Sequence, residues 1–174
     1  MILAMDKMIG MGFCSTVFES GNLAYKLFKR GPNVPPRHTE EGRRKTFASQ
    51  CQAYALAARD GFLRDHVASF YGTCGIEDVI DIDGCSLRQD YLLDCCYVLE
   101  VLNGDPVTHP TLSSPVDHLR DAVSRFARIG IDVHDADVFF AEDRQRFKFV
   151  DFEMEHWFAV DVIAPPVSDS TDNE

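Results

Sequence analysis

The chain has 174 residues, of which 45% are hydrophobic and 26% charged, and these proportions exclude a mostly disordered protein and fit a single folded domain. Its formal net charge of -11 argues against nucleic acids and anionic membrane surfaces as partners. No segment approaches the roughly 20 apolar residues that span a bilayer, and no leader pattern is visible, so we expect a cytoplasmic protein, with leaderless secretion left open. The six cysteines lack disulfide-framework and metal-ligand spacing and are predicted to be reduced.

The first part of the chain predicts strands with one helix among them. Short β-branched and aromatic runs from Ile9 to Lys29 predict two strands joined by a tight turn at Ser20 to Asn22. The proline-containing segment Arg30 to Gly42 predicts a loop, and the spacing of apolar residues predicts a helix from about Arg43 to Arg59. The expected apolar face of this helix consists of Phe47, Cys51, Tyr54, Ala55 and Ala58. Three extended segments follow, at Val67 to Ile76, Val79 to Ile82 and Tyr91 to Leu102.

The second part predicts one helix followed by a hairpin. Helical spacing favours a helix from Val116 to Ile129, whose expected apolar face consists of Val116, Leu119, Val123, Phe126 and Ala127. Val138 to Ala141 and Phe147 to Phe152 read as the two strands of a hairpin, and the small, acidic residues 165–174 predict a disordered tail. The order β-β-α-β-β-β-α-β-β indicates an α+β fold with an antiparallel sheet.

A glycine-rich element near the start of the chain lies between strands. Gly10, Gly12, Ser15 and Val17 form a G-x-G-x-x-S-x-V pattern, and Lys26 lies on the next strand. Backbone N–H groups in such a loop approach phosphate oxygens without interference from Cβ atoms, and a nearby lysine supplies a positive charge to the same phosphates. A G-x-G in a hairpin is also typical of a simple turn, and this one is no dinucleotide-binding fingerprint, because a strand rather than a helix follows it.

Two further elements follow the predicted second helix. Gly130 to Phe140 contains Asp132 and Asp137, and Phe149 to Glu153 contains Asp151 in a D-F-E sequence. With these elements the chain resembles the protein-kinase superfamily, in which a helix leads into a D-x-H-x-x-N loop, a hairpin and then D-F-G or D-F-E. Upstream, Ser49 to Tyr54 resembles the E-C-x-A-Y helix of short fungal kinase-like proteins, and Val98 to Leu102 resembles the strand that holds adenine. Minimal kinases of phages and secreted bacterial effectors are similarly short.

The resemblance implies a kinase-like fold with an antiparallel N-lobe sheet, one helix of the αC type and a strongly reduced C-lobe. A single domain would cover 1–164, with the N-lobe at about 1–103 and the C-lobe at about 104–164. ATP and magnesium are the implied cofactors. Asp132 and Lys26 would be catalytic, and Asp137 and Asp151 would bind the metal. The implied nucleotide-binding residues, of which Glu100 and Leu102 offer backbone groups to adenine, are Gly10, Gly12, Ser15, Val17, Lys26, Glu100 and Leu102.

Several residues depart from the family pattern. Gln50 replaces the helix glutamate that pairs with the strand lysine, Asp137 replaces the metal-binding asparagine, and Gly130 replaces the usual catalytic-loop histidine. An alternative register with His134 and Asp135 as the catalytic pair would spoil the spacing to Asp137. Only 23 residues follow Asp151, and we expect Trp157 and Phe158 to cover the core where further helices would otherwise pack.

These patterns predict an ATP-dependent phosphotransferase that moves the γ-phosphoryl group to a hydroxyl. A protein Ser or Thr is slightly preferred over a small molecule as the acceptor, so the expected partners are ATP and a protein. The alternative is a pseudokinase that binds a nucleotide or a protein without turnover. A third reading is an α+β interaction domain without a nucleotide site. The oligomeric state stays open.

Overall fold

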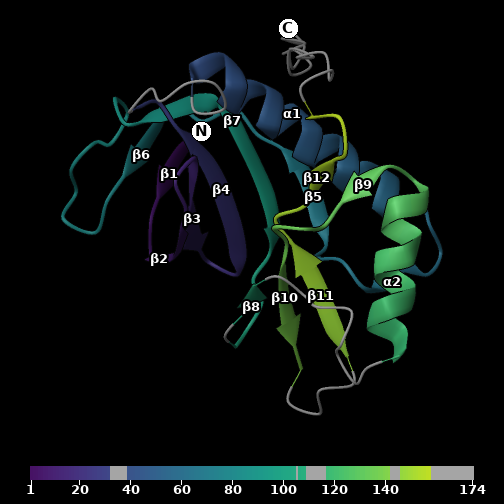
Figure 1. Ribbon diagram of the computed structural model, residues 1–174. Helices are drawn as coiled ribbons and strands as arrows, with labels where there is room; N and C mark the ends of the chain where they lie inside the picture. The colour runs from purple at the N-terminus through teal and green to yellow at the C-terminus, as the bar shows by residue number, and fades with distance from the viewer. Residues whose placement is uncertain (32–38, 105, 109–116, 142–145, 158–174) are drawn as a thin grey trace, which may run out of the picture.

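The computed structural model describes residues 1–31, 39–104, 106–108, 117–141 and 146–157 as a mixed α+β fold. Its largest element is an antiparallel five-stranded sheet in the order β2-β3-β4-β7-β5 (Figure 1). The strands of this sheet are β2 Lys7–Met11, β3 Ser15–Ser20, β4 Leu23–Lys29, β7 Tyr91–Glu100 and β5 Phe70–Thr73. The α+β class and the antiparallel sheet expected from the sequence are therefore confirmed.

The predicted hairpin of β3 and β4 is confirmed together with its turn. Ser20 pairs with Leu23, which leaves a two-residue loop whose first residue, Gly21, has a φ of 61°. A positive φ at the first position of such a loop favours glycine. The pairing of β2 with β3 shifts register at Ile9, so β2 bulges next to Gly10.

Helix α1, Glu40–Ala57, begins three residues before its predicted start. Thr39 caps it, because the Thr39 hydroxyl accepts a hydrogen bond from the N–H of Gly42 at 3.0 Å, and Glu40 and Glu41 lie in the first turn. The predicted apolar face was wrong at Ala55 and Ala58, which are exposed. Polar side chains occupy much of the buried face instead, namely Arg43, Thr46, Ser49 and Gln50.

A parallel strand pair covers the other face of the sheet. It consists of β1 Ile2–Ala4 and β6 Asp78–Ile80. The predicted extended segment Val79 to Ile82 overlaps its second strand, whereas the first strand and the pairing were not predicted. Neighbouring residues of a strand point to opposite faces, so Tyr97 of β7 packs with α1 whereas Cys96 packs with Leu3 and Val79 of this pair. The sheet therefore has a separate apolar cluster on each face.

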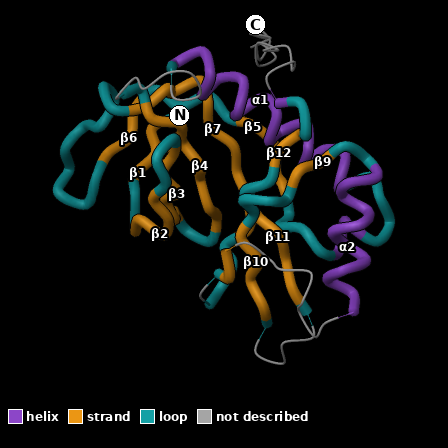
Figure 2. Tube along the Cα trace, viewed as in Figure 1, coloured by secondary structure: helices purple, strands orange, loops and turns teal. Residues whose placement is uncertain are grey.

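The C-terminal part consists of one helix and two small sheets. Helix α2, Asp117–Arg128, lies close to the predicted range, but Ala127 is exposed and Ala122 is buried in its place. The predicted hairpin is confirmed as β10 Asp137–Phe140 and β11 Phe147–Val150, with β8 Val107–Thr108 beside β10. A short pair, β9 Ile131–Asp132 and β12 Glu153–Met154, lies between α1 and α2 (Figure 2).

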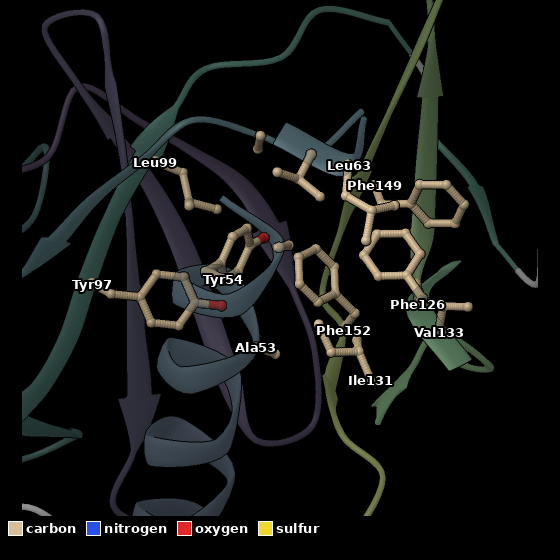
Figure 3. Close-up of a cluster of buried hydrophobic side chains, with 14 of the residues drawn as sticks. Ala53, Tyr54, Leu63, Tyr97, Leu99, Phe126, Ile131, Val133, Phe149 and Phe152 are labelled. Atoms are coloured by element: carbon tan, nitrogen blue, oxygen red, sulfur yellow. The ribbon is translucent and has the colours of Figure 1, made fainter. Parts of the chain in front are cut away.

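One apolar cluster joins the two parts of the molecule. Figure 3 shows Phe152 between Tyr54 of α1 and Phe126 of α2. The ring centroids of Phe152 lie 4.4 Å from Tyr54 and 5.3 Å from Phe126, and Phe126 packs on Phe149 of β11 at 5.0 Å. The residue after Asp151 is thus fixed by packing, which also fixes where Asp151 lies.

Other expectations from the sequence were partly met. The extended segment Val67 to Ile76 contains only β5 and an isolated bridge from Val67 to Phe149, and a short 3-10 helix, η1 Leu63–Asp65, precedes it. All six cysteines are free thiols. No helix in the described part of the chain is both long and apolar enough to cross a membrane. The predicted proline-containing loop at 32–38, the turn at 142–145, Val116, Phe158 and the tail at 165–174 lie outside the described residues.

Candidate functional site

A cavity of about 540 Å³ lies where the β2–β3 hairpin, the sheet and the β10–β11 hairpin meet. The sequence elements predicted to bind phosphates, adenine and metal come together here from distant parts of the chain. The predicted residues that line this cavity are Gly10, Gly12, Ser15, Val17, Lys26, Glu100, Leu102, Asp137 and Asp151. Apolar side chains add to the wall at the end of β7, where Ala24, Leu99, Val101 and Leu102 contribute. The cavity thus has an apolar end and a charged end.

The charged end centres on an ion pair between Lys26 and Asp151. Lys26 lies on β4 opposite Tyr97, its side chain is only 5% exposed, and its Nζ donates a hydrogen bond to Asp151 Oδ1. Asp151 is 45% exposed at the cavity wall. A buried ammonium needs a partner to offset its lost hydration, and Asp151 supplies that partner here.

Gln50 of α1 joins this pair as a hydrogen-bond donor. Its Nε2 donates to Asp151 Oδ1 at 2.9 Å, and its Oε1 accepts from the Tyr97 hydroxyl at 2.8 Å. Burial, together with the nearby negative charge of Asp151, raises the pKa of Tyr97 well above its ordinary value, so this hydroxyl keeps its proton. Tyr97 therefore orients the Gln50 amide with its nitrogen toward Asp151. Gln50 of α1 therefore bonds to the Asp151 carboxylate and not to the Lys26 ammonium.

Asp151 also has an unusual backbone conformation. Its φ is 61°, and it is the sole non-glycine residue with a positive φ in the described ranges. Such a conformation disfavours residues with a Cβ atom and persists where the surroundings hold it in place. Phe152 in the core on one side and the contacts with Lys26 and Gln50 on the other provide these constraints.

Asp137 supplies a second carboxylate to the cavity. It lies on β10 opposite Val150, one residue before Asp151. Its Oδ1 is buried and has no hydrogen-bond partner among the residues that the structure describes. A buried carboxylate oxygen without a partner is costly, and a cation beside it would remove that cost. Asp137 and Asp151 line the same cavity, and one or two carboxylates together with substrate phosphates are the ligands by which proteins often hold magnesium.

Within the described ranges, no group of three or more His, Cys, Asp or Glu side chains could hold a metal ion without further ligands. An ion between Asp137 and Asp151 would thus depend on oxygen atoms from a ligand such as a nucleotide phosphate.

The two loop glycines are not explained by the fold alone. Neither Gly10 nor Gly12 has a positive φ. A Cβ atom added to Gly10 would lie 3.5 Å from the Val17 side chain, and one added to Gly12 would lie 3.8 Å from the Ser15 carbonyl, both ordinary contacts. Because the protein itself leaves room for a side chain at these positions, the absence of one suits a ligand that approaches the backbone closely.

Asp132 lies beside a smaller cavity of about 330 Å³ that shares Gly12, Ser15, Lys26 and Asp151 with the larger one. It is exposed on β9, pairs across the strands with Glu153, and accepts a hydrogen bond from the N–H of His134 at 2.8 Å. Asp135 also lines this smaller cavity, whereas His134 is exposed and is absent from its lining. Asp132 thus lies next to the charged end of the site.

Glu100 was predicted to offer backbone groups to adenine, and its contacts within the protein limit this role. Its backbone N–H donates to the Ser69 carbonyl at 3.0 Å, and its carboxylate accepts from the Ser69 N–H and from Lys148 Nζ. Partial burial raises the pKa of Glu100, but the hydrogen bonds from Lys148 and Ser69 outweigh this and leave it below its ordinary value. Leu102, in contrast, lies beyond the end of β7 and lines the cavity.

Tyr97 and Glu153 line these cavities although the sequence did not single them out as site residues, and Asp135 entered the sequence analysis only through the alternative register. Tyr97 read as a core residue because it lies in the apolar run at Tyr91 to Leu102. The available signal was its alternation with Cys95 and Leu99, which puts all three on the sheet face that also carries Lys26.

Comparison of the chain with protein-family models, with curated proteins and with solved structures finds no match.

Replacing Tyr97 with phenylalanine is expected to lower the free energy of unfolding by about 1–3 kcal/mol, because Gln50 Oε1 becomes a buried acceptor without a donor. Urea denaturation followed by circular dichroism measures the change. Tyr91→Phe is the matched control, since its hydroxyl donates to Thr16 Oγ1 at 3.2 Å on the opposite face of the sheet, away from Gln50, and a smaller loss is expected there. Equal losses for the two variants would contradict the role given to Tyr97.

Proposed function

We propose that the protein is an ATP-dependent phosphotransferase with a compact kinase-like fold. In this proposal it moves the γ-phosphoryl group of ATP to a hydroxyl group, with a protein Ser or Thr preferred over a small molecule as the acceptor. The observation that carries the proposal is the meeting of the glycine-rich hairpin, Lys26, Asp137 and Asp151 around one cavity. These are the groups that phosphoryl transfer requires: backbone amides, a cation for the phosphates, and carboxylates for a metal.

The residues have distinct roles in this proposal. The apolar end of the cavity, with Val17, Ala24 and Leu99, receives the adenine ring, and Leu102 offers backbone groups to its edge. Lys26 leaves Asp151 to bind the α and β phosphates. Magnesium, when bound, neutralises charge on the phosphates, and Asp137 and Asp151 are the residues that would hold it.

Asp132 completes the proposed chemistry as the acceptor of a proton. The acceptor hydroxyl forms a new bond from its oxygen to the γ phosphorus, the bond from the γ phosphorus to the ADP oxygen breaks, and the hydroxyl proton moves to the Asp132 carboxylate. The exposed position of Asp132 at the smaller cavity leaves room for a substrate hydroxyl next to the charged end of the site.

A second candidate is a nucleotide- or protein-binding pseudokinase, and one contact favours it. In active protein kinases the lysine pairs with a helix glutamate while the aspartate of the D-F-G sequence binds metal. Here the helix residue is Gln50, and Lys26 pairs with Asp151 itself. ATP and metal must therefore separate this pair before both groups can act, which disfavours turnover.

The two candidates differ in one experiment. Wild type, Asp132→Ala and Asp151→Ala are incubated with γ-labelled ATP and magnesium or manganese, alone, with a protein lysate and with a metabolite mixture, and their melting temperatures are measured with and without ATP. Label transfer by wild type that both variants lose supports the phosphotransferase. A rise in melting temperature with ATP but no transfer in any mixture supports the pseudokinase. The absence of any shift at millimolar ATP excludes the phosphotransferase and a nucleotide-binding pseudokinase.

Alanine at Gly10 or Gly12 is expected to weaken ATP binding about tenfold or more, equivalent to about 1.4 kcal/mol, because a methyl group would stand between the backbone and the phosphates. The stability of the unliganded protein should stay equal or rise by up to about 1 kcal/mol, since both backbones accept alanine. Gly21→Ala is the matched control. Its φ of 61° predicts a loss of about 1–2 kcal/mol in stability and unchanged ATP affinity. Thermal shift titrations measure both quantities, and unchanged ATP affinity in Gly12→Ala would count against a phosphate-binding loop.

A further inference from the structure

Two thiols face each other on the side of the sheet turned away from the cavity. Cys96 lies in β7, and Cys74 directly follows β5. Their sulfur atoms are 3.5 Å apart, and the N–H of Cys74 donates to the Cys96 carbonyl at 3.0 Å. Since Thr73 pairs with Tyr97, the two cysteines are directly opposite across the strands.

This arrangement fits a disulfide without movement of the backbone. Directly opposite residues of antiparallel strands have Cα atoms about 4.5–5.5 Å apart, which lies inside the span of about 4.4–6.8 Å found for disulfides. Only side-chain rotation is needed to bring the two sulfur atoms from 3.5 Å to bonding distance. The other thiols differ: Cys85 is exposed on the segment between β6 and β7, and Cys95 belongs to the cluster on the opposite face of the sheet.

The two thiols are chemically unequal. The hydrogen bond with Cys96 and the nearby N-terminal amine lower the pKa of Cys74, although burial opposes this. The same hydrogen bond and its burial raise the pKa of Cys96 well above its ordinary value. Cys74 is also partly exposed, whereas Cys96 is fully buried. Cys74 is therefore the one of the two thiols that an oxidant in solution can reach, and its thiolate is the reactive form.

We propose that Cys74 and Cys96 form an oxidation site at which a hydroperoxide converts the pair into an intramolecular disulfide. The Cys74 thiolate attacks one oxygen of hydrogen peroxide, the O–O bond breaks, and Cys74 becomes a sulfenic acid, while the leaving hydroxide takes from solvent the proton that the thiol gave up and becomes water. The Cys96 sulfur then bonds to the Cys74 sulfur, the S–O bond breaks, and the hydroxyl leaves with the Cys96 proton as a second water. Two thiol hydrogens are lost overall, and the oxidant takes up the two electrons.

The disulfide would fasten β5 to β7 and close a loop that contains β6. Such a cross-link restricts the unfolded chain, so the oxidised protein is expected to melt at a higher temperature than the reduced one. Cys96 is also the neighbour of Tyr97, which orients Gln50 on the other face of the sheet. Oxidation would therefore stiffen the strand that supports the candidate site. The oxidation site is independent of the proposed phosphotransferase function.

The test uses the full-length reduced protein treated with hydrogen peroxide, blocked with an alkylating reagent and analysed by mass spectrometry without reduction. The expected product lacks the mass of two hydrogen atoms and yields a cross-linked peptide pair. Trypsin separates Cys74 from Cys96 at Arg88, and cleavage at Glu77 separates Cys74 from Cys85. The cross-link and the higher melting temperature should disappear after dithiothreitol is added.

Single serine variants test whether the disulfide joins Cys74 to Cys96. Cys95→Ser and Cys85→Ser should keep the cross-link, whereas Cys74→Ser and Cys96→Ser should lose it. Cys74 is partly exposed, so Cys74→Ser keeps the test valid even if the buried Cys96→Ser variant fails to fold. Over-oxidation of Cys74 without a cross-link would overturn the proposal, and so would a cross-link to Cys85 or Cys95 or its loss in Cys95→Ser.

Discussion

Replacing Lys26 with methionine is expected to abolish most of the ATP-dependent rise in melting temperature while the unliganded protein stays folded. Methionine keeps the apolar stem packed near Phe28 and Tyr97, whose ring centroids lie 5.8 and 5.9 Å from Lys26 Nζ. It removes the only cationic side chain that the larger and smaller cavities share. A hydrogen bond to a charged group contributes about 1.5–3 kcal/mol, which corresponds to roughly a 10- to 100-fold loss of affinity.

The stability of the unliganded variants provides a second readout. Lys26→Met removes a buried charge together with its cost, so its free energy of unfolding should equal or exceed that of wild type. Asp151→Ala leaves the Lys26 ammonium and the Gln50 amide without their shared acceptor and should be less stable than wild type. Lys45→Met, which removes a cation paired with Glu41 on α1, is the control and should bind ATP normally. Equal ATP affinity for Lys26→Met and Lys45→Met would contradict a phosphate-binding role for Lys26.

Replacing Phe126 with alanine is expected to lower the free energy of unfolding by about 3–5 kcal/mol, a large part of the 5–15 kcal/mol typical of a folded domain. Phe126 is fully buried on α2 and contacts Phe149 and Phe152, so its loss opens a cavity where the two parts of the molecule meet (Figure 3). Urea denaturation monitored by tryptophan fluorescence and circular dichroism measures the change.

An exposed aromatic residue is the control for this core variant. Tyr71 on β5 is 61% exposed, and Tyr71→Ala should cost less than about 1 kcal/mol. Phe126→Ala should also reduce ATP binding, if the proposed site is correct, because Phe152 fixes the position of Asp151. A loss of less than about 1 kcal/mol for Phe126→Ala would show that the cluster does not join the two parts.

Local patterns predicted the elements that depend on neighbouring residues. The tight turn at Gly21 and the hairpin of β10 and β11 follow from turn residues and alternation, and both were found. Thr39 followed by two glutamates is a helix-start pattern, but the prolines of the preceding segment led to a predicted loop that extended through Gly42.

Long-range pairings could not be read in this way. β1 and the pair of β9 with β12 are two or three residues long and form only because distant segments meet them. The predicted buried face of α1 was correct at Phe47 and Tyr54 but missed Ser49 and Gln50, whose polar atoms find partners far along the chain. The spacing of apolar residues cannot predict which polar residues of a helix are buried. The predicted glycine, lysine and aspartate residues belong to short motifs that can be read along the chain, and the structure brings them to one cavity, whereas the contact of Tyr97 with Gln50 is a long-range one.

The apolar cluster that joins α1, the large sheet, α2 and β11 has a practical consequence for dissection of this protein. Neither part is expected to be a viable fragment, because Tyr54, Phe152 and Phe126 each complete a surface supplied by the other part. Cleavage between β7 and α2 should yield insoluble or unstructured pieces, and heating the intact chain should give one cooperative transition. All residues that line the pocket should therefore lose their arrangement in the same unfolding transition.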